Sequence, residues 1–304
     1  MLSDEFSQKM HANNIRFSLL PIEKLSLLKK EIENTLDNVI EDKKLSKYIS
    51  YAYNFNVAND FPQAKSIIIA AKFNPAHQIR LISNGKTHNI TIPPGYINFR
   101  SKQIALEKSV NDILTPAGYK IKRIILPVKL LAVQSGLAEY GRNNIAYIPE
   151  FGSYHFLASF LSDFPADNHI PSESKYMAEC EICRLCTKTC PSGAISKSRF
   201  LIKAERCLTL FNRNDGQFPD FIDNDWHNSL FGCMKCQERC PANADIPDKM
   251  HFLDSFDEDE SHQLLNKPYQ NYSENLKTII DKWGMPELVH LIQRNLNAII
   301  KNSY

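Results

Sequence analysis

The cysteine residues constrain this chain more than any other feature. All eight lie between residues 180 and 240. In chain order they form two runs separated by a lone cysteine: Cys180-x-x-Cys183-x-x-Cys186-x-x-x-Cys190-Pro191, then Cys207, then Cys233-x-x-Cys236-x-x-x-Cys240-Pro241. Runs of this spacing hold iron–sulfur clusters, and eight thiolates are the number that two 4Fe–4S clusters need. The sequence therefore predicts a metal-binding redox protein that moves single electrons.

The spacing also predicts which cysteines share a cluster. In two-cluster ferredoxins the fourth cysteine of such a run ligates the other cluster. We therefore expect one cluster to be bound by Cys180, Cys183, Cys186 and Cys240, and the second by Cys190, Cys207, Cys233 and Cys236. The isolated position of Cys207, well before Cys233, departs from the plain ferredoxin repeat. Exchanged ligands would place the two clusters close together.

Two other uses of the cysteines are open. Paired C-x-x-C motifs also suit tetrahedral zinc, although zinc sites rarely use the longer run that ends in Cys-Pro. Disulfides would need an oxidising compartment. The first residues, Met1-Leu2-Ser3-Asp4-Glu5-Phe6, contain no apolar stretch typical of a secretory signal. We therefore expect a reduced, cytoplasmic protein.

Composition sets broad limits on the fold. A chain of 304 residues with a 43% hydrophobic share predicts about two packed domains. Its formal net charge of +2 points neither to nor away from nucleic acid. The longest apolar stretches, such as residues 66–71, are far shorter than the ~20 residues of a membrane span, so no membrane partner is expected.

Hydrophobic periodicity predicts both helices and strands. Apolar residues at helical spacing indicate helices over residues 22–47, 101–114 and 128–137, and again over 288–299. Isoleucine-rich stretches indicate strands over residues 65–73, 88–92 and 123–128. Residues 175–248 read as loops around the clusters, and residues 254–260 as an acidic linker. Strands that alternate with helices favour an α/β or α+β architecture.

Three stretches resemble the epoxyqueuosine reductase family, whose relatives include cobalamin-dependent reductive dehalogenases. They are Pro62–Ile69, the glycine-containing stretch Ser135–Asn144 with Glu150–Tyr154, and the cysteine set with Cys190–Ile195 and Gly232–Gln237. The likeness extends from about residue 60 to 245. The glycine-containing stretch ahead of the cysteines makes it more specific than a ferredoxin pattern alone.

The resemblance implies that a cobalamin is held base-off between an α/β domain and the cluster domain. It predicts an α/β domain over residues 1–172, a ferredoxin-like two-cluster domain over 173–248 and a helical C-terminal extension over 249–304. Carried over by position, the residues near the corrin would be Gly136, Gly141, Arg142, Asn143, Gly152, Ser153 and Tyr154, and His155 is a further pocket candidate. His169, in Asp167-Asn168-His169, is expected to be a loop residue rather than a cobalt ligand.

The chain departs from the family where the reaction takes place. The family's proton-donating aspartate corresponds to Lys122, and residues 95–98 replace an Asp-Tyr-His stretch. Arg142 replaces a lysine, which keeps the charge but changes the hydrogen-bond geometry. Lys120, Lys122, Arg123 and Lys129 form only a modest basic cluster, of a size typical of a solvated face.

These observations leave three functions open. The first is a cobalamin-dependent reductase with its own, different substrate, which would act on a small molecule. The second is an electron-transfer or corrinoid-handling protein without a substrate, and the third is a tRNA epoxyqueuosine reductase. Each needs an electron donor such as ferredoxin or flavodoxin. The missing aspartate favours the second over the first, and the glycine-containing stretch favours a bound cofactor in either case.

Overall fold

The structure is a computed structural model that describes residues 2–38, 43–55, 57, 61–166, 176–196 and 201–301. Its helices are α1 (Leu2–Ala12), α2 (Lys24–Asn38), α3 (Lys43–Ala52), α5 (Phe99–Leu114), α6 (Val128–Gln134), α7 (Leu185–Thr189), α8 (Leu208–Arg213), α9 (Lys235–Glu238), α10 (Glu258–Asn266), α11 (Glu274–Trp283) and α12 (Val289–Lys301). Its strands are β1 (Ile15–Pro21), β2 (Ser66–Phe73), β3 (Ala76–Ser83), β4 (Lys86–Ile92), β5 (Ile121–Ile124), β6 (Glu139–Tyr140), β7 (Ala146–Tyr147), β8 (His155–Ser162) and β9 (Met250–Phe256).

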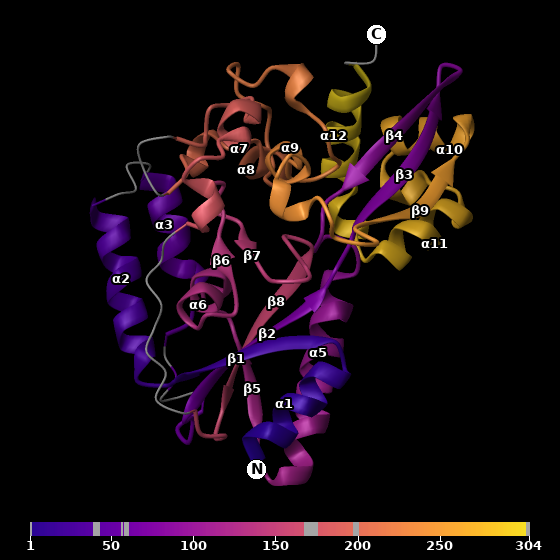
Figure 1. Ribbon diagram of the computed structural model, residues 1–304. Coiled ribbons are helices and arrows are strands. Elements are labelled where there is room, and N and C mark those ends of the chain that lie inside the picture. Colours follow the sequence, from indigo (N-terminus) through magenta and orange to yellow (C-terminus); the bar gives the residue numbers. More distant parts are fainter. Residues whose placement is uncertain are drawn as a thin grey trace.

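The main sheet has the order β1-β2-β8-β5, and all its neighbours are antiparallel. Both faces of β2 are buried. Ile67 and Ile69 pack on the side of α2 and α6, while Ile68 packs on the side of α1 and α5. Side chains alternate along a strand, so one isoleucine-rich strand serves both cores. The result is a sheet covered by helices on two faces (Figure 1).

A second sheet has the order β4-β3-β9. A two-residue turn, Asn84-Gly85, joins β3 to β4, and both residues have positive φ (52° and 69°). This is the turn chemistry that tight hairpins prefer. Helices α10, α11 and α12 pack on this sheet through a separate core that includes Phe256 and Trp283. Figure 1 shows this part beside the cluster segments α7, α8 and α9, which lie beyond one end of the main sheet.

Several expectations hold with small changes in bounds. Strand β2, strand β4 and helix α5 lie where the sequence placed them, and α12 follows the apolar pattern of residues 288–299. The helix expected over 22–47 is two helices, α2 and α3, and residues 39–42 between them lie outside the described residues. Strand β5 ends at Ile124, three residues before Pro127, which precedes α6. His169 and the boundary near residue 172 also lie outside the described residues.

The acidic linker expected over residues 254–260 was wrong. Strand β9 continues to Phe256 and pairs in parallel with β3. Asp257 then caps α10: its Oδ1 accepts from the Glu260 N–H at 2.9 Å, and Glu260 accepts from the Asp257 N–H at 3.3 Å. The acidic residues thus form a capping box and a first helical turn, where negative charge is favourable. The C-terminal extension is therefore not helical throughout.

Candidate redox site

Short helical turns position the eight cysteines. Cys180 ends the turn Ala178–Cys180, and Cys190 follows α7, which contains Cys186. Cys207 directly precedes α8, and Cys236 lies in α9. All eight are free thiols. These turns bring segments that are far apart in sequence to the same end of the molecule (Figure 1).

Four thiols form a first electrostatic group. Burial raises the pKa of Cys180, and the neighbouring charges of Cys240 and Cys183 raise it further. Burial likewise raises the pKa of Cys186, and Cys180 and Cys240 add to the shift. Cys240 therefore lies with the three cysteines of the first run, although it is about 60 residues beyond Cys180 in the chain.

The other four thiols form a second group. Burial is the main reason that the pKa values of Cys207, Cys233 and Cys236 are raised. Cys190 acts on all three, and Cys207 acts on both Cys233 and Cys236. This grouping is the one that exchanged ligands require. The role of each cysteine as an iron ligand stays a prediction.

The donor set fits iron–sulfur clusters. Each group offers four thiols, and metal binding would remove the protons that burial otherwise retains. Among the residues that the structure describes, no three His, Cys, Asp or Glu side chains are arranged to hold a single metal ion. In a cubane cluster each thiolate binds a different iron, so its ligands need not converge on one point.

Polar groups already face the sulfur atoms of the second group. The Asn228 amide donates to Cys233 Sγ at 3.2 Å. Thr209 donates from its backbone and side chain to Cys207, and Ser192 Oγ lies 3.6 Å from Cys190 Sγ. Hydrogen bonds to sulfur raise the reduction potential of a cluster by stabilising its more negative state. These side chains are therefore candidates for tuning the second cluster.

Two cavities adjoin the second group and not the first. The larger, of about 390 Å³, is lined by all four of its cysteines, by α2 and α3, and by residues of the glycine-containing stretch. The smaller, of about 310 Å³, is lined by β8 and by the Pro93–Pro94 turn. Five lining residues are common to both: Lys129, Ile145, Thr209, Cys233 and Gln237. The cavities are thus neighbours that share a wall.

Lys129, at the start of α6, is a site residue that sequence reasoning missed. Lys129 is exposed, as expected for the basic cluster with Lys120, Lys122 and Arg123. Its side chain also lines both cavities, where protein surrounds the ammonium group. Burial lowers the pKa of its ammonium, while the charge of Cys207 opposes the shift. Lys129 is the second residue of a helix that follows Pro127, and this was the sequence signal that could have pointed to the site.

Lys122 occupies a different place. It lies on β5, opposite Leu161, and is exposed. It lines neither cavity. Neither cavity has an Asp or Glu among its described lining residues. The position equivalent to the family's aspartate therefore does not face the site, and no nearby carboxylate replaces it among these lining residues.

The residues expected near a corrin are divided by the structure. Asn143 lines the larger cavity, and Ser153 and His155 line the smaller. Arg142 instead faces the first thiol group: its guanidinium donates to the Cys180 carbonyl (3.0 and 3.2 Å) and lies 4.6 Å from the Tyr176 ring. That Asn143, Ser153, His155 and Arg142 contact a corrin stays a prediction.

The other expected residues have packing roles in the structure. A Cβ at Gly141 would lie 2.5 Å from the Tyr147 ring, and one at Gly152 would lie 2.3 Å from Asn243 Oδ1. Tyr154 is buried against Ala76 and Met234. Gly136 has a φ of 75°, as the turn after α6 requires. None of these four lines either cavity. Gly141 and Gly152 allow protein segments to approach each other closely.

His155 has one ring nitrogen available. Its Nε2 lies 2.8 Å from the Ala146 carbonyl and therefore carries the proton. Its Nδ1 is buried and has no hydrogen-bond partner. Burial lowers the pKa of His155, against the effect of the Ala146 bond and with a further contribution from Lys129. A neutral imidazole acceptor thus lies in the wall of the smaller cavity.

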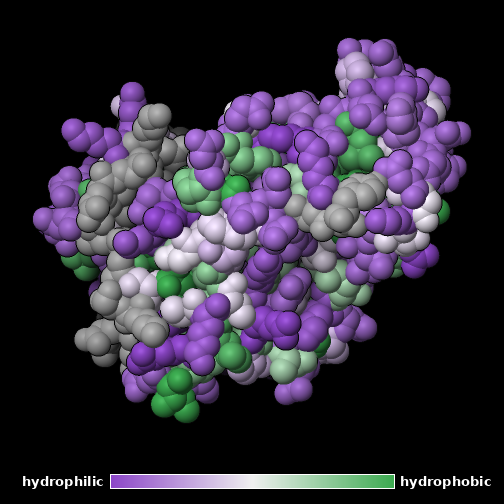
Figure 2. Space-filling view, turned by 90° about the horizontal axis from the view of Figure 1, so that it is seen from above, coloured by the Kyte–Doolittle hydropathy of each residue, from purple (hydrophilic) through white to green (hydrophobic). Residues whose placement is uncertain are grey.

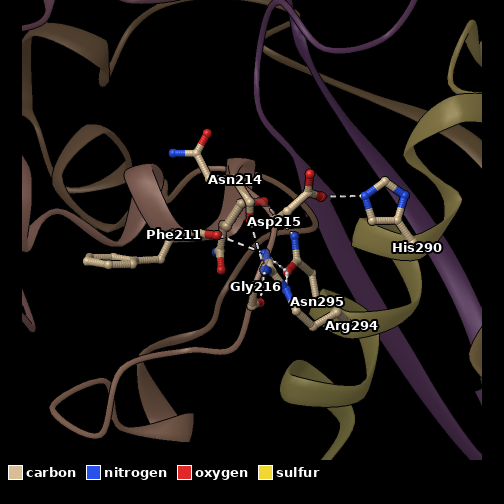
Figure 3. Close-up of polar contacts among 8 residues, drawn as sticks. Phe211, Asn214, Asp215, Gly216, His290, Arg294 and Asn295 are labelled. Atoms are coloured by element: carbon tan, nitrogen blue, oxygen red, sulfur yellow. Dashed lines mark hydrogen bonds and ion pairs between the residues drawn. The ribbon is translucent and has the colours of Figure 1, made fainter. Parts of the chain in front are cut away.

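The C-terminal helix holds the loop between Cys207 and Cys233. Arg294 of α12 donates to the carbonyls of Phe211, Asn214 and Gly216 at 2.6–2.8 Å. Asn295 donates to Asn212 and Leu230, and His290 lies 2.5 Å from Asp215 (Figure 3). Helix α12 is therefore part of the support of the second thiol group.

Comparison with known proteins agrees with two groups of four cysteines that would each bind a 4Fe–4S cluster. Residues 179–243 match the family described as "4Fe-4S double cluster binding domain". The epoxyqueuosine reductase of Atelocyanobacterium thalassa is 26% identical over 226 residues, which is 72% of each chain. That of Bacillus subtilis is 31% identical over 115 residues, 38% of this chain. This match spans only 28% of the Bacillus subtilis protein's length.

Solved structures show the same fold. The epoxyqueuosine reductase of Streptococcus thermophilus matches 99% of this chain and 81% of its own, with a TM-score of 0.67 and 18% identity. An epoxyqueuosine reductase solved with a modified tRNA stem loop matches 91% of this chain and 81% of its own, with a TM-score of 0.56 and 21% identity. The mixed α and β fold is confirmed. Residues 179–243 carry a domain for two 4Fe–4S clusters, and the chain is similar to epoxyqueuosine reductases in sequence and in fold.

Proposed function

We propose that this protein is a cobalamin-dependent iron–sulfur reductase whose substrate differs from epoxyqueuosine in tRNA. One observation carries the proposal. The cysteines of the second group form part of the wall of the 390 Å³ cavity. An electron on a cluster at that place would be next to whatever ligand the cavity binds.

The assignment of ligands follows the two thiol groups. Cys180, Cys183, Cys186 and Cys240 would bind the first cluster, and Cys190, Cys207, Cys233 and Cys236 the second. Electrons would pass from a ferredoxin or flavodoxin to the first cluster, then to the second, and then to the cavity. The domain ranges 1–172, 173–248 and 249–304 form part of this proposal, with β9 joining the last range to β3.

The cavity walls suit a large amide-bearing cofactor. Asn143, Ser153 and Gln237 are polar lining residues, although the Asn143 amide already donates to the Tyr147 hydroxyl. His155 Nδ1 is an unsatisfied buried acceptor. The remaining walls are largely apolar, as in most cofactor sites. Cobalamin would supply redox chemistry at cobalt, while the protein binds, orients and shields it from water.

The departures from the family argue for another substrate. Lys129 presents positive charge to both cavities, and no Asp or Glu appears among their described lining residues. An apolar wall formed by Ile32 and Leu36 of α2 and Ile49 of α3 lies opposite. These surfaces favour a small, partly apolar molecule with a negative group over a nucleoside in RNA.

The tRNA alternative has little support outside the relatives. One relative was solved with a tRNA stem loop. In this chain, however, Arg123 lies 3.7 Å from Glu107, and the exposed Lys129 lines the two cavities. What stays exposed of the basic cluster is too small for the electrostatic footprint that RNA binding needs.

The alternative without a substrate remains distinct. An electron-transfer or corrinoid-handling protein would use the same clusters and the same cavity but release its ligand unchanged.

No helix in the described residues is long and apolar enough to cross a membrane.

Anaerobic binding of hydroxocobalamin tests the proposal. We expect the purified, cluster-loaded protein to retain about one corrinoid per chain after gel filtration and to show the spectrum of a base-off form. His155→Phe and Asn143→Ala should weaken retention, whereas Lys122→Ala should not. A protein with intact clusters that retains no corrinoid would contradict the cobalamin part and leave electron transfer as the function. Retention with release of unaltered corrinoid after reduction would favour the handling role.

A further inference from the structure

The two thiol groups differ in what lies beside them. The second group faces the cavities, but the segment that carries Cys183 and Cys186 faces outward. Ile182, between Cys180 and Cys183, has 90% of its side-chain surface exposed, and Leu185 has 42% exposed. Among the described residues, Ile182 is the most exposed of the large hydrophobic side chains, and Leu185 lies three residues further along the chain. They belong to the loop that surrounds the first thiol group.

We propose that residues 181–188 are the docking surface for an acidic, one-electron carrier protein. The proposal rests on the proposed function only in its claim that the two thiol groups hold clusters. An external donor must approach a cluster from outside the cavities, and the two cavities are lined by cysteines of the second group and by none of the first. Docking at Ile182 would bring the carrier directly over the first cluster.

The charge of this surface suits an acidic partner. Exposed Arg184 and Lys188 accompany the apolar pair, against one exposed carboxylate, Glu181. The segment therefore carries two positive charges and one negative charge, a net of +1. An apolar centre with a charged rim is the common form of protein interfaces, and redox partners form small ones.

The surrounding surface supports a small contact. Figure 2 looks onto the end of the molecule that carries the cluster segments, and hydrophobic residues appear there as separate patches among hydrophilic ones. A permanent partner would need a larger continuous apolar area. The geometry instead fits brief encounters, in which affinity is low and the donor leaves after each electron.

Stopped-flow reduction of the anaerobic holoprotein tests the inference. Photoreduced flavodoxin is one reductant and dithionite the other, and cluster bleaching is followed in both. Ile182→Glu should lower the second-order rate constant with flavodoxin at least tenfold and leave the dithionite rate within twofold. Ile104→Glu on α5 is the matched control, because Ile104 is 53% exposed and lies on a helix of the main sheet. It should change neither rate.

A second variant guards against a loss of cluster assembly in Ile182→Glu. Arg184→Glu reverses one rim charge without altering the apolar pair, and it should lower the flavodoxin rate more at low salt than at high salt. Equal flavodoxin rates in wild type, Ile182→Glu and Arg184→Glu would overturn the inference. A wild-type protein that dithionite cannot bleach would instead contradict the proposed clusters.

Discussion

Ser153 and Asn243, 90 residues apart in the chain, exchange two hydrogen bonds. The Ser153 N–H donates to Asn243 Oδ1, and the Asn243 amide donates to Ser153 Oγ, both at 2.9 Å. Asn243 lies three residues after Cys240, and Ser153 lies two residues before β8. This pair therefore joins the cluster segment to the main sheet beside the smaller cavity.

Replacing Gly152 should disrupt that junction. Gly152 has a φ of 55°, and an added Cβ would lie 2.3 Å from Asn243 Oδ1. We expect Gly152→Ala to cost about 3 kcal/mol of unfolding free energy, from backbone strain together with the clash. Gly85→Ala is the control, since Gly85 has a φ of 69° but no atom within 4 Å of its Cβ position. It should cost only about 1 kcal/mol by urea denaturation. Similar losses in both variants would mean that the close approach to Asn243 has no effect.

Removing the charge of Lys129 should lower the potential of the second cluster. A nearby cation stabilises the reduced, more negative state, so Lys129→Met should shift this potential downward by on the order of 50 mV. An EPR-monitored redox titration would resolve the two clusters, and the first serves as an internal reference. Lys122→Met, on the exposed strand β5, should leave both potentials unchanged. A Lys129→Met protein with the wild-type potential would show that this ammonium does not act on the cluster.

Replacing Arg294 should lower the stability of the protein more than replacing His290, which lies on the same helix. Arg294→Met removes hydrogen bonds to three carbonyls of α8 and the loop after it, and we expect a loss of about 2 kcal/mol with faster release of iron from the second cluster. His290→Ala removes the pair with Asp215, in which both side chains are largely exposed, and should cost under about 1 kcal/mol. Chelator challenge and chemical denaturation measure the two effects. The reverse order of severity would argue against α12 as the support of this loop.

His227 should make stability depend on pH. Burial lowers its pKa to about 4, with further contributions from Arg294 and Lys235. Between pH 6.5 and 4 the unfolded chain binds a proton that the folded chain does not, so stability falls as the pH decreases through this range. The loss approaches about 3 kcal/mol near pH 4.

The variant His227→Phe isolates this effect. Both ring nitrogens of His227 are buried without partners, and the ring packs on Phe218 at 4.5 Å, so an apolar ring fits the environment. Denaturation at pH 7 and at pH 5.5 should show a smaller loss in the variant than in the wild type. An identical pH dependence would place the cause elsewhere.

The sequence predicted features that depend on local spacing. Strand β2 was found because its isoleucines form a continuous apolar run, and α12 because its apolar residues recur at helical intervals. The double-cluster domain was found because cysteine spacing is imposed by the cluster itself. Each of these signals lies within one segment of chain.

Features that depend on distant partners were missed. Strand β8 lies between β2 and β5 in the main sheet, and it was missed although Pro149 and Gly152 mark a turn before its start. The hairpin of β3 and β4 was partly overlooked even though Asn84-Gly85 marks its turn. The place of Lys129 in the walls of both cavities was missed because charge gives no sign of the direction in which a side chain points. The acidic residues 257–260 read as a linker because their role as a helix cap depends on backbone geometry.

The central claim is that two thiol groups hold two 4Fe–4S clusters, the second beside the cavities. Anaerobic iron and sulfide analysis, combined with EPR of the dithionite-reduced protein, tests it most directly. We expect about eight iron and eight sulfide per chain, with spectra of two interacting reduced clusters. Cys207→Ser should remove the second cluster's signal and leave that of the first. Zinc in place of iron, or a reduced sample without an EPR signal, would rule out the two iron–sulfur clusters.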